Sequence, residues 1–323
     1  MNRKNAGAVF CTLCGLTALT AMSAEIFYDF SINTKSPIHM SKLNNLVQKV
    51  TNTSGSEEDA SEKYSGLTGT PEMKKWYNEH GEDVYIMSDS LRLHGKIFKN
   101  NSSKYVIVCH GYTSKAKHMA GFVNKFYSLG YNVLAADARA HGDSEGTKIG
   151  MGWPERFDVI EWIKLIISWE PNAQIILHGV SMGAATVLMA SGEELPENVK
   201  VIIADCGYTS EWDEFKCKAN ALHIPWFPVL NAASVMSKLR DGYDFKQASA
   251  LEKVKQSRIP TLFIHGSDDE LVPYSMLDKL YSAAACEKEC LTVNGAGHAL
   301  SSSVEPELYW NTVESFIEKY SEK

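Results

Sequence analysis

The middle of the chain reads Ile175-Ile176-Leu177-His178-Gly179-Val180-Ser181-Met182-Gly183-Ala184-Ala185. The apolar run predicts a buried strand that ends near His178, and the small residues after it predict a helix that begins near Ser181. Gly179 and Gly183 lack a Cβ, so the chain can turn sharply and the helix can pack close to the strand. A serine at such a turn exposes its hydroxyl. We therefore expect a nucleophile at Ser181, and the alternative is a purely structural glycine turn.

Strand-like and helix-like stretches alternate on both sides of this turn. Six strands are expected at 105–109, 131–136, 174–178, 199–204, 261–264 and 290–293, and helices at 116–129, 155–168, 182–191, 275–284 and 306–319. Two earlier strands, at 84–87 and 91–98, flank the turn Ser88-Asp89-Ser90. Strands that alternate with helices favour a parallel sheet covered on both faces. We therefore expect an α/β protein with a mostly parallel, eight-stranded sheet.

Composition and charge exclude some classes of partner. The chain has 323 residues, of which 44% are hydrophobic, and a formal net charge of -7. It carries no basic run of the kind that binds nucleic acid, so we expect no nucleic-acid partner. Of the seven cysteines, Cys11 and Cys14 have C-x-x-C spacing, but they lie in an apolar segment and no second such pair follows, so no metal site is expected. Cys286 and Cys290 could form a local disulfide if the protein is exported, or they could remain two free thiols.

The N-terminus carries an apolar segment, Ala6–Ala24, behind Arg3 and Lys4. Nineteen apolar residues can just span a bilayer. The positive charges before the segment predict that the rest of the chain lies outside the cytoplasm. The rival interpretation is a cleaved signal peptide that ends at Met22-Ser23-Ala24. The protein is therefore expected either in the cell membrane, with its catalytic part outside the cytoplasm, or secreted.

The remaining organisation follows from composition. Residues 25–70 are polar and rich in Ser, Thr, Glu and Asp towards their centre, which predicts a linker or leader with a helix around Met40–Val50. The globular domain is expected over 71–323, after the N-terminal anchor or signal segment at 1–24. Within it, residues 211–256 contain no clear strand, which interrupts the alternation of strands and helices.

A serine nucleophile needs a base and a group that orients the base. The order Ser, Asp, His, with each residue in a loop after a strand, suits one sheet architecture. Asp268 and Asp269 both follow the expected strand at 261–264, and we favour Asp269 as the acid. His298 follows the last strand behind small residues that let it approach Ser181. The alternative for both aspartates is that they are solvated loop charges.

Hydrolysis by such a serine also needs two N–H donors for the oxyanion. We assign them to the backbone N–H groups of Met182 and Tyr112, since Met182 follows the nucleophile and Tyr112 follows the strand at 105–109. His110, just before Gly111 and Tyr112, is expected to be structural.

These residues and several neighbouring motifs resemble the α/β-hydrolase superfamily over residues 76–320. The motifs are Ser88–Gly95, His110-Gly111-Tyr112, Asp137–Gly146, the turn around Ser181, the aspartate loop that ends at Val272-Pro273, and Gly297-His298. More narrowly, the chain resembles bacterial membrane-anchored or exported esterase-like or serine-aminopeptidase-like hydrolases. Two loop positions depart from the family pattern, because Ser90 and Ala140 stand where glycine is usual.

The resemblance implies an α/β-hydrolase fold and a helical cap over the active site at 211–256. Candidates for the apolar lining of this cap are Trp212, Phe215, Leu222, Ile224, Trp226, Phe227, Val229 and Leu230. It also implies that the loop around Asp137, Arg139 and His141 is structural, with substrate binding by Arg139 as the alternative. Arg156 and Asp158 are expected to be structural as well.

The expected function is hydrolysis of a carboxylic ester through an acyl-enzyme, without metal or organic cofactor. The expected substrate is a small, apolar acyl compound. A peptidase or amidase, or a thioesterase, would use the same three residues and stays open. A catalytically dead cell-surface binding protein is the alternative from a different class.

Overall fold

The computed structural model describes residues 3–42, 65–221, 223 and 225–321. Its elements in chain order are α1 (Arg3–Ser31), α4 (Ser65–Thr68), α5 (Pro71–His80), β1 (Glu82–Ser88), β2 (Leu91–Phe98), β3 (Lys104–Cys109), η1 (Ala116–Met119), α6 (Ala120–Ser128), β4 (Asn132–Ala136), α7 (Glu155–Trp169), β5 (Gln174–Val180), α8 (Met182–Ala190), β6 (Val199–Asp205), α9 (Glu211–Ala221), α10 (Val229–Asp241), α11 (Ala250–Val254), β7 (Thr261–Gly266), α12 (Ser275–Ala283), β8 (Lys288–Val293), α13 (Ser301–Val304) and α14 (Pro306–Ser321).

The eight strands form one sheet in the order β1-β2-β4-β3-β5-β6-β7-β8. The pairs β1–β2 and β2–β4 are antiparallel, and the remaining pairs are parallel. The predicted α/β fold with a mostly parallel, eight-stranded sheet is therefore confirmed. The central strands are apolar along almost their whole length because helices cover both of their faces.

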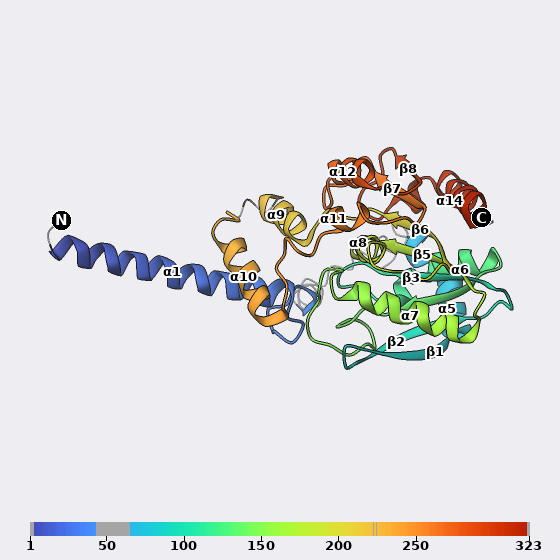
Figure 1. Ribbon diagram of the computed structural model, residues 1–323, viewed down its shortest axis with the longest axis horizontal. Helices are drawn as coiled ribbons and strands as arrows, with labels where there is room; N and C mark the ends of the chain where they lie inside the picture. The colour runs from blue at the N-terminus through green and yellow to red at the C-terminus, as the bar shows by residue number, and fades with distance from the viewer. Residues whose placement is uncertain (1–2, 43–64, 222, 224, 322–323) are drawn as a thin grey trace.

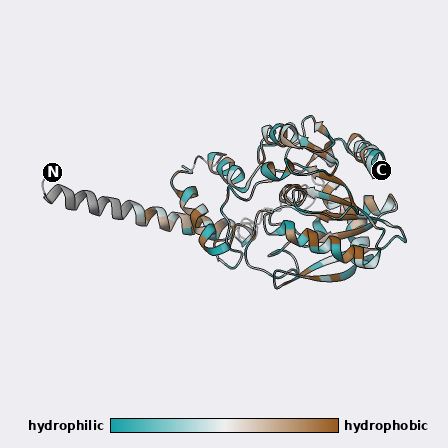
Figure 2. Cartoon of the chain, viewed as in Figure 1, coloured by the Kyte–Doolittle hydropathy of each residue, from teal (hydrophilic) through white to brown (hydrophobic). Residues whose placement is uncertain are grey.

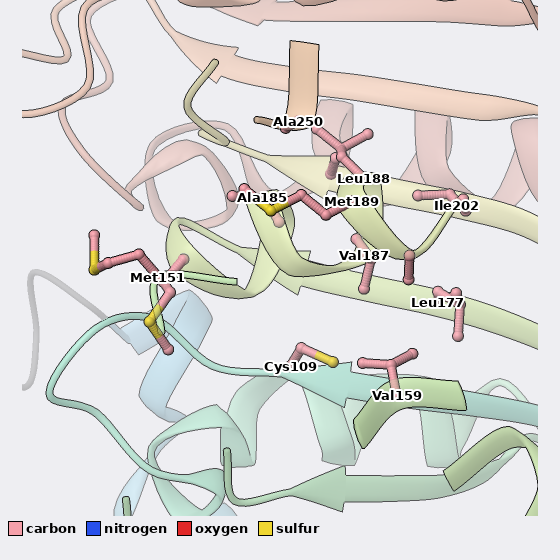
Figure 3. Packing of buried hydrophobic residues seen from close by; sticks show 14 of the residues in the cluster. Cys109, Met151, Val159, Leu177, Ala185, Val187, Leu188, Met189, Ile202 and Ala250 are labelled. Atoms are coloured by element: carbon pink, nitrogen blue, oxygen red, sulfur yellow. The ribbon is translucent and has the colours of Figure 1, made fainter. Parts of the chain in front are cut away.

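Helices pack on the two faces of this sheet and enclose two apolar cores. Residues of α7, α8, α11 and α12 contribute to one core, and residues of α5, α6 and α14 contribute to the other. Figure 2 shows the strands in hydrophobic colours between these helices. In Figure 3, Val187, Leu188 and Met189 of α8 lie among the side chains of neighbouring strands. Burial of each contributes about 1.5–3 kcal/mol, so α8 is held firmly against β5.

The stretch 211–256 contains helices α9, α10 and α11, and it separates β6 from β7. Figure 1 shows α9 and α10 at the end of the molecule near α1, away from β8 and α14. Of the residues expected to line the cap, Leu222 and Ile224 fall outside the described residues.

The N-terminal segment differs from the expected linker at its start. Helix α1 continues to Ser31, and Ala24, Tyr28 and Ile32 are buried. Figure 1 shows that α1 projects from the domain and that its C-terminal end lies beside α10. Apolar residues beyond position 24 explain this difference, because they supply a face that packs on the domain. Most of the expected helix around Met40–Val50 lies outside the described residues.

The sequence also predicted a membrane anchor or signal segment over residues 1–24, most of which lie in α1. No helix in the described part of the chain is long and apolar enough to cross a membrane.

The open question about Cys286 and Cys290 is answered by their positions. Both are free thiols, Cys290 is exposed, and the Cys286 thiol lies 3.6 Å from the Thr261 hydroxyl.

Candidate active site

Ser181 stands at the turn between β5 and α8 with φ 57° and ψ -118°. A positive φ on a residue with a side chain costs about 1–3 kcal/mol, so the surrounding structure must impose it. A Cβ on Gly179 would lie 2.2 Å from the Gly183 carbonyl oxygen, and one on Gly183 would lie 2.1 Å from the Cys109 carbonyl oxygen. Both glycines are therefore required by close backbone approach, as the sequence indicated.

The structure brings Ser181, His298 and Asp269 together from three loops that are far apart in the sequence. His298 Nε2 lies 2.9 Å from Ser181 Oγ, and His298 Nδ1 lies 2.8 Å from Asp269 Oδ2. If Nδ1 carries the proton, it donates to the carboxylate and leaves Nε2 free to accept the serine proton. This geometry suits a base that is oriented by an acid.

The carboxylate of Asp269 is buried and held by several donors. Its Oδ1 accepts hydrogen bonds from the N–H groups of Leu271 and Val272, each at 2.9 Å. Burial alone would raise its pKa, but the hydrogen bonds from His265 and His298 outweigh burial and hold the pKa well below its usual value. Asp269 therefore stays ionised beside His298. Asp268 is exposed, and its Oδ1 accepts from the Ser267 hydroxyl at 2.6 Å.

His265 is a residue of this site that the sequence analysis missed. Its Nε2 lies 3.3 Å from Asp269 Oδ2, on the carboxylate oxygen that also faces His298, and 2.9 Å from the Val272 carbonyl oxygen. The side chain is buried. The spacing of four residues between His265 and Asp269 was the available signal, since both stand at the end of β7.

Asp205, at the end of β6, is the second residue that was missed. Its carbonyl oxygen accepts the Ser181 N–H at 2.8 Å, and its Oδ1 accepts from the Ser301 hydroxyl at 3.4 Å. Burial raises the pKa of Asp205 to about 6. The residue thus connects the nucleophile turn to the segment that follows His298.

The two residues expected to supply oxyanion donors lie on either side of the nucleophile. Met182 begins α8, and Tyr112 follows β3 across Gly111, where a Cβ would lie 3.3 Å from Ser181 Cβ. His110 hydrogen-bonds within the backbone around this turn, because Nδ1 donates to the Gly111 carbonyl at 2.8 Å and Nε2 accepts from the Ala138 N–H at 3.0 Å. This arrangement agrees with a structural role for His110.

The loop around Asp137, Arg139 and His141 braces the same edge of the sheet. Arg139 is buried and makes two hydrogen bonds to Asp158, at 2.8 and 2.6 Å. His141 Nε2 accepts the Thr113 N–H at 3.1 Å, next to Tyr112. Because the guanidinium group is committed to Asp158, the geometry agrees with the structural interpretation of Arg139.

A cavity of about 330 Å³ is lined by Tyr112 and by Leu271, whose N–H donates to Asp269, while Ser181 and His298 are not part of its lining. Its walls come from the N-terminal segment, the cap and the loops next to Ser181, namely Phe27, Phe30, Ser31, Met40, Tyr112, Phe215, Cys217, Lys218, Ala219, Ala221, Pro225, Trp226, Val229, Leu230, Glu270 and Leu271. Four of the predicted cap residues, Phe215, Trp226, Val229 and Leu230, are therefore in the wall. Trp212 packs against Trp226 instead, with ring centroids 6.2 Å apart, and Phe227 is exposed.

A larger cavity of about 800 Å³ lies elsewhere, and its lining includes Arg139, Arg156 and Arg240 but not Ser181 or His298. These three cations are paired with carboxylates of Asp158, Glu193 and Glu25, in that order. The larger cavity therefore offers no free cation among these three to a ligand.

Two groups of donor atoms in the described residues are close enough to share a metal ion. One is Cys206, Asp269 and His298, and the other is His94, Asp137 and Asp143. In both groups the histidine and an aspartate are already hydrogen-bonded to each other, at 2.8 and 2.7 Å. Neither group therefore presents a set of free ligands.

Comparison with known proteins places the chain among hydrolases. The family described as serine aminopeptidase, S33, matches residues 100–247, which include Ser181 but not Asp269 or His298. The uncharacterized protein YqkD of Bacillus subtilis is 30% identical over 219 residues, which cover 67% of this chain and 72% of that protein. The lysophosphatidylserine lipase ABHD12 of Macaca fascicularis is 28% identical over 213 residues, which cover 65% of this chain but only 50% of the lipase.

Solved structures of similar fold also include hydrolases. The esterase Pf2001 of Pyrococcus furiosus superposes with a TM-score of 0.63 and 26% identity, and the match covers 76% of this chain and 94% of the esterase. The fold over about three quarters of this chain is thus shared with an enzyme that is described as an esterase.

Proposed function

This chain belongs to the α/β-hydrolase superfamily and is a hydrolase with esterases and lipases among its relatives, and from that premise we propose that it cleaves carboxylic esters through an acyl-enzyme on Ser181. The observation that carries the proposal is the chain of two short hydrogen bonds, 2.9 Å from Ser181 to His298 and 2.8 Å from His298 to Asp269. Ser181, His298 and Asp269 therefore have the spacing that a nucleophile, its base and an orienting acid require, without a bound substrate.

In the first half of the reaction, Ser181 Oγ attacks the ester carbonyl carbon while His298 Nε2 takes the serine proton. Asp269 stabilises the imidazolium that forms. The N–H groups of Tyr112 and Met182 are assigned to the oxyanion, where preorganised donors stabilise the tetrahedral intermediate. Collapse of the intermediate breaks the bond to the alcohol oxygen, and His298 gives its proton to that oxygen. Ser181 is left as an ester of the acyl group.

In the second half, a water molecule gives one proton to His298 and attacks the acyl carbon. The resulting tetrahedral intermediate expels Ser181, which recovers its proton from His298, and the carboxylic acid leaves. Every proton removed in the two halves is returned, so the three side chains end in their starting state.

The apolar cavity that Tyr112 and Leu271 line supports an apolar acyl group. Phe27, Phe215 and Trp226 supply aromatic walls, and Lys218 and Glu270 are the charged residues among its lining. Apolar cavities with few polar groups are typical of sites for small organic ligands. One relative is described as a lysophosphatidylserine lipase, which also supports an acyl ester as the substrate.

Amide hydrolysis is the second candidate, because the matching family is described as a serine aminopeptidase. The same three residues would cleave an amide if His298 protonated the leaving amine. Parallel assays with an aryl ester and an aminoacyl anilide separate the two activities, and we expect the ester to be the better substrate.

The decisive experiment compares Ser181→Ala with Ser168→Ala, which removes an exposed hydroxyl on α7 that donates to the Leu165 carbonyl. We expect Ser181→Ala to lose hydrolysis of p-nitrophenyl butyrate by about 10⁴-fold or more and to lose labelling by a fluorophosphonate probe. Ser168→Ala should retain both. Labelling of Ser181→Ala at the wild-type level would contradict the assignment of the nucleophile.

A further inference from the structure

The 330 Å³ cavity that Tyr112 and Leu271 line has a further wall from residues that precede the sheet in the sequence. Phe27, Phe30 and Ser31 of α1, together with Met40, line it along with the cap residues Phe215, Trp226, Val229 and Leu230. In sequence, this wall lies more than forty residues before the first strand of the sheet. The sequence analysis assigned the same residues to a linker, so no role in the site was expected for them.

The wall is fixed to the cap by charged and polar contacts. Arg240 of α10 makes two hydrogen bonds of 2.8 Å to the carboxylate of Glu25. The Tyr28 hydroxyl donates to the carboxylate of Asp241, with oxygen distances of 2.8 and 3.0 Å. The ring of Phe27 packs edge-on against Phe215, with centroids 5.1 Å apart. These contacts hold the end of α1 in one position relative to α9 and α10.

The segment after α1 is also fixed to the body of the domain. The Ile149 N–H donates to the Ile32 carbonyl at 3.0 Å, and the Thr34 N–H donates to the Thr147 carbonyl at 2.9 Å. Ile32 itself is buried. The wall is therefore bound on two sides, and its half-buried side chains face a space of defined size.

Tyr112 connects the wall from α1 to the loop next to Ser181. The Tyr112 hydroxyl donates to the Ser31 carbonyl at 2.8 Å, and the backbone N–H of the same residue is assigned to the oxyanion. Leu271, which also lines the cavity, donates its N–H to Asp269. An acyl chain that extends from a carbonyl at Ser181 into the cavity would therefore pass between these two residues and meet the side chains of α1.

We propose that the segment from Phe27 to Met40 determines which acyl chains the enzyme accepts, with Phe30 as the residue that limits their length. The proposal rests on the proposed ester hydrolysis and adds its substrate class, an ester of a medium-length, unbranched fatty acid. A volume of about 330 Å³ lies at the small end of ligand cavities, which span about 300–1,000 Å³. Such a cavity accepts a flexible chain and excludes a bulky acyl group.

Phe30 is the best position for a test, since it is only half-buried, whereas Phe27 also packs against the cap. Ile26 is the matched control, because it lies on the same helix, is 57% exposed and is not in the cavity wall. The measured quantity is the ratio of kcat/KM for p-nitrophenyl dodecanoate to that for p-nitrophenyl butyrate. The full chain is used throughout.

We expect Phe30→Ala to raise this ratio about tenfold and Phe30→Trp to lower it about tenfold, since a few methylenes in an apolar pocket change specificity by that much. Ile26→Ala should leave it within twofold of wild type. Phe30→Leu replaces the alanine variant if that variant does not fold. A ratio that stays at the wild-type value in both directions, or moves the same way in both, would overturn the proposal, because a merely structural role would lower both activities together.

A binding measurement separates failure of this proposal from failure of the proposed function. Calorimetric titration of dodecanoate into Ser181→Ala and into Ser181→Ala with Phe30→Trp reports on the cavity without catalysis. Weaker binding by the double variant supports the role of the wall even if the wild-type protein shows neither ester turnover nor labelling at Ser181. Equal binding by both proteins overturns the proposed wall even if ester turnover and labelling are normal.

Discussion

The nucleophile turn and the acyl-cavity wall lie next to each other but are built differently. At the nucleophile turn, the whole of α8 is buried and the neighbouring chain approaches so closely that only glycine fits at 179 and 183. The cavity wall combines half-buried Phe27 and Phe30 of α1 with buried cap residues such as Phe215 and with exposed Leu271. The comparison indicates that the backbone turn at Ser181 is set by a short run of sequence, whereas the cavity is set by segments that meet only after folding.

The largest expected effect tests the first region through its acid. Asp269→Asn should lower kcat for a short-chain aryl ester by about 10³–10⁴-fold, because an amide can donate a hydrogen bond to His298 and favour the wrong tautomer. Steady-state kinetics at pH 8 measure it, and the ratio of activities on long and short esters should not change.

The neighbour Asp268 supplies the control. Asp268→Asn leaves an exposed residue of similar size and should retain wild-type kcat. If the two variants were equally impaired, the role of the acid could not be assigned to Asp269.

The sequence predicted the first region far better than the second. Strand and helix positions around Ser181 could be read from apolar runs, because a strand buried on both faces has a nearly continuous apolar sequence. Ser181, Asp269 and His298 were recognisable by their order along the chain. His265 and Asp205 were not, since a buried histidine or aspartate at a strand end looks like any other loop residue until its partners are known.

The cavity wall was harder to predict for a physical reason. Phe27 and Phe30 are apolar residues in a segment that resembles an anchor followed by a linker, and their partners Phe215 and Leu230 are about 190 to 200 residues away. No periodicity encodes such a pairing. Conversely, the family's usual glycines at 90 and 140 are explained by the structure, because Ser90 and Ala140 have φ of 66° and 62°.

The two regions also differ in whether a buried carboxylate has a hydrogen-bond partner, and this difference gives a second prediction. Asp205 accepts from Ser301, whereas neither oxygen of Glu211 in α9 has a hydrogen-bond partner in the described part of the chain. Burial, followed by the nearby Glu155, raises the pKa of Glu211 well above its usual value. A raised pKa means that stability is greatest below the unfolded pKa and is lost as the pH rises towards the folded pKa.

Glu211→Gln removes this titration. The variant should be more stable than wild type at pH 8 by about 1–3 kcal/mol, because the amide needs no proton to stay neutral when it is buried, and the difference should shrink towards pH 4, where the wild-type carboxyl binds its proton at little cost. Urea unfolding at both pH values measures it. Glu252→Gln, at an exposed site in α11, should show no such pH-dependent gain, and a gain in both variants would point to net charge instead.

The smallest effect concerns strained backbone outside the chemistry. Ala140→Gly should raise the free energy of unfolding by about 0.5 kcal/mol, because relief of the left-handed conformation slightly exceeds the added freedom of the unfolded chain. Ala138→Gly, whose φ is not positive, should lower it by about 0.5–1 kcal/mol. Thermal unfolding of the two variants is the measurement. Equal losses would show that the strain at Ala140 is not relieved by glycine.

The hydrogen bond from Tyr112 to the Ser31 carbonyl has a consequence for how such enzymes diversify. The donor is a side chain, but the acceptor is backbone, so almost any residue at position 31 preserves the contact. The side chains of the N-terminal segment can therefore be changed while the hydrogen bond from Tyr112 to the backbone at position 31 is kept. If the proposed wall sets the substrate range, that range can be altered by exchanging this segment without changing Ser181, Asp269 or His298.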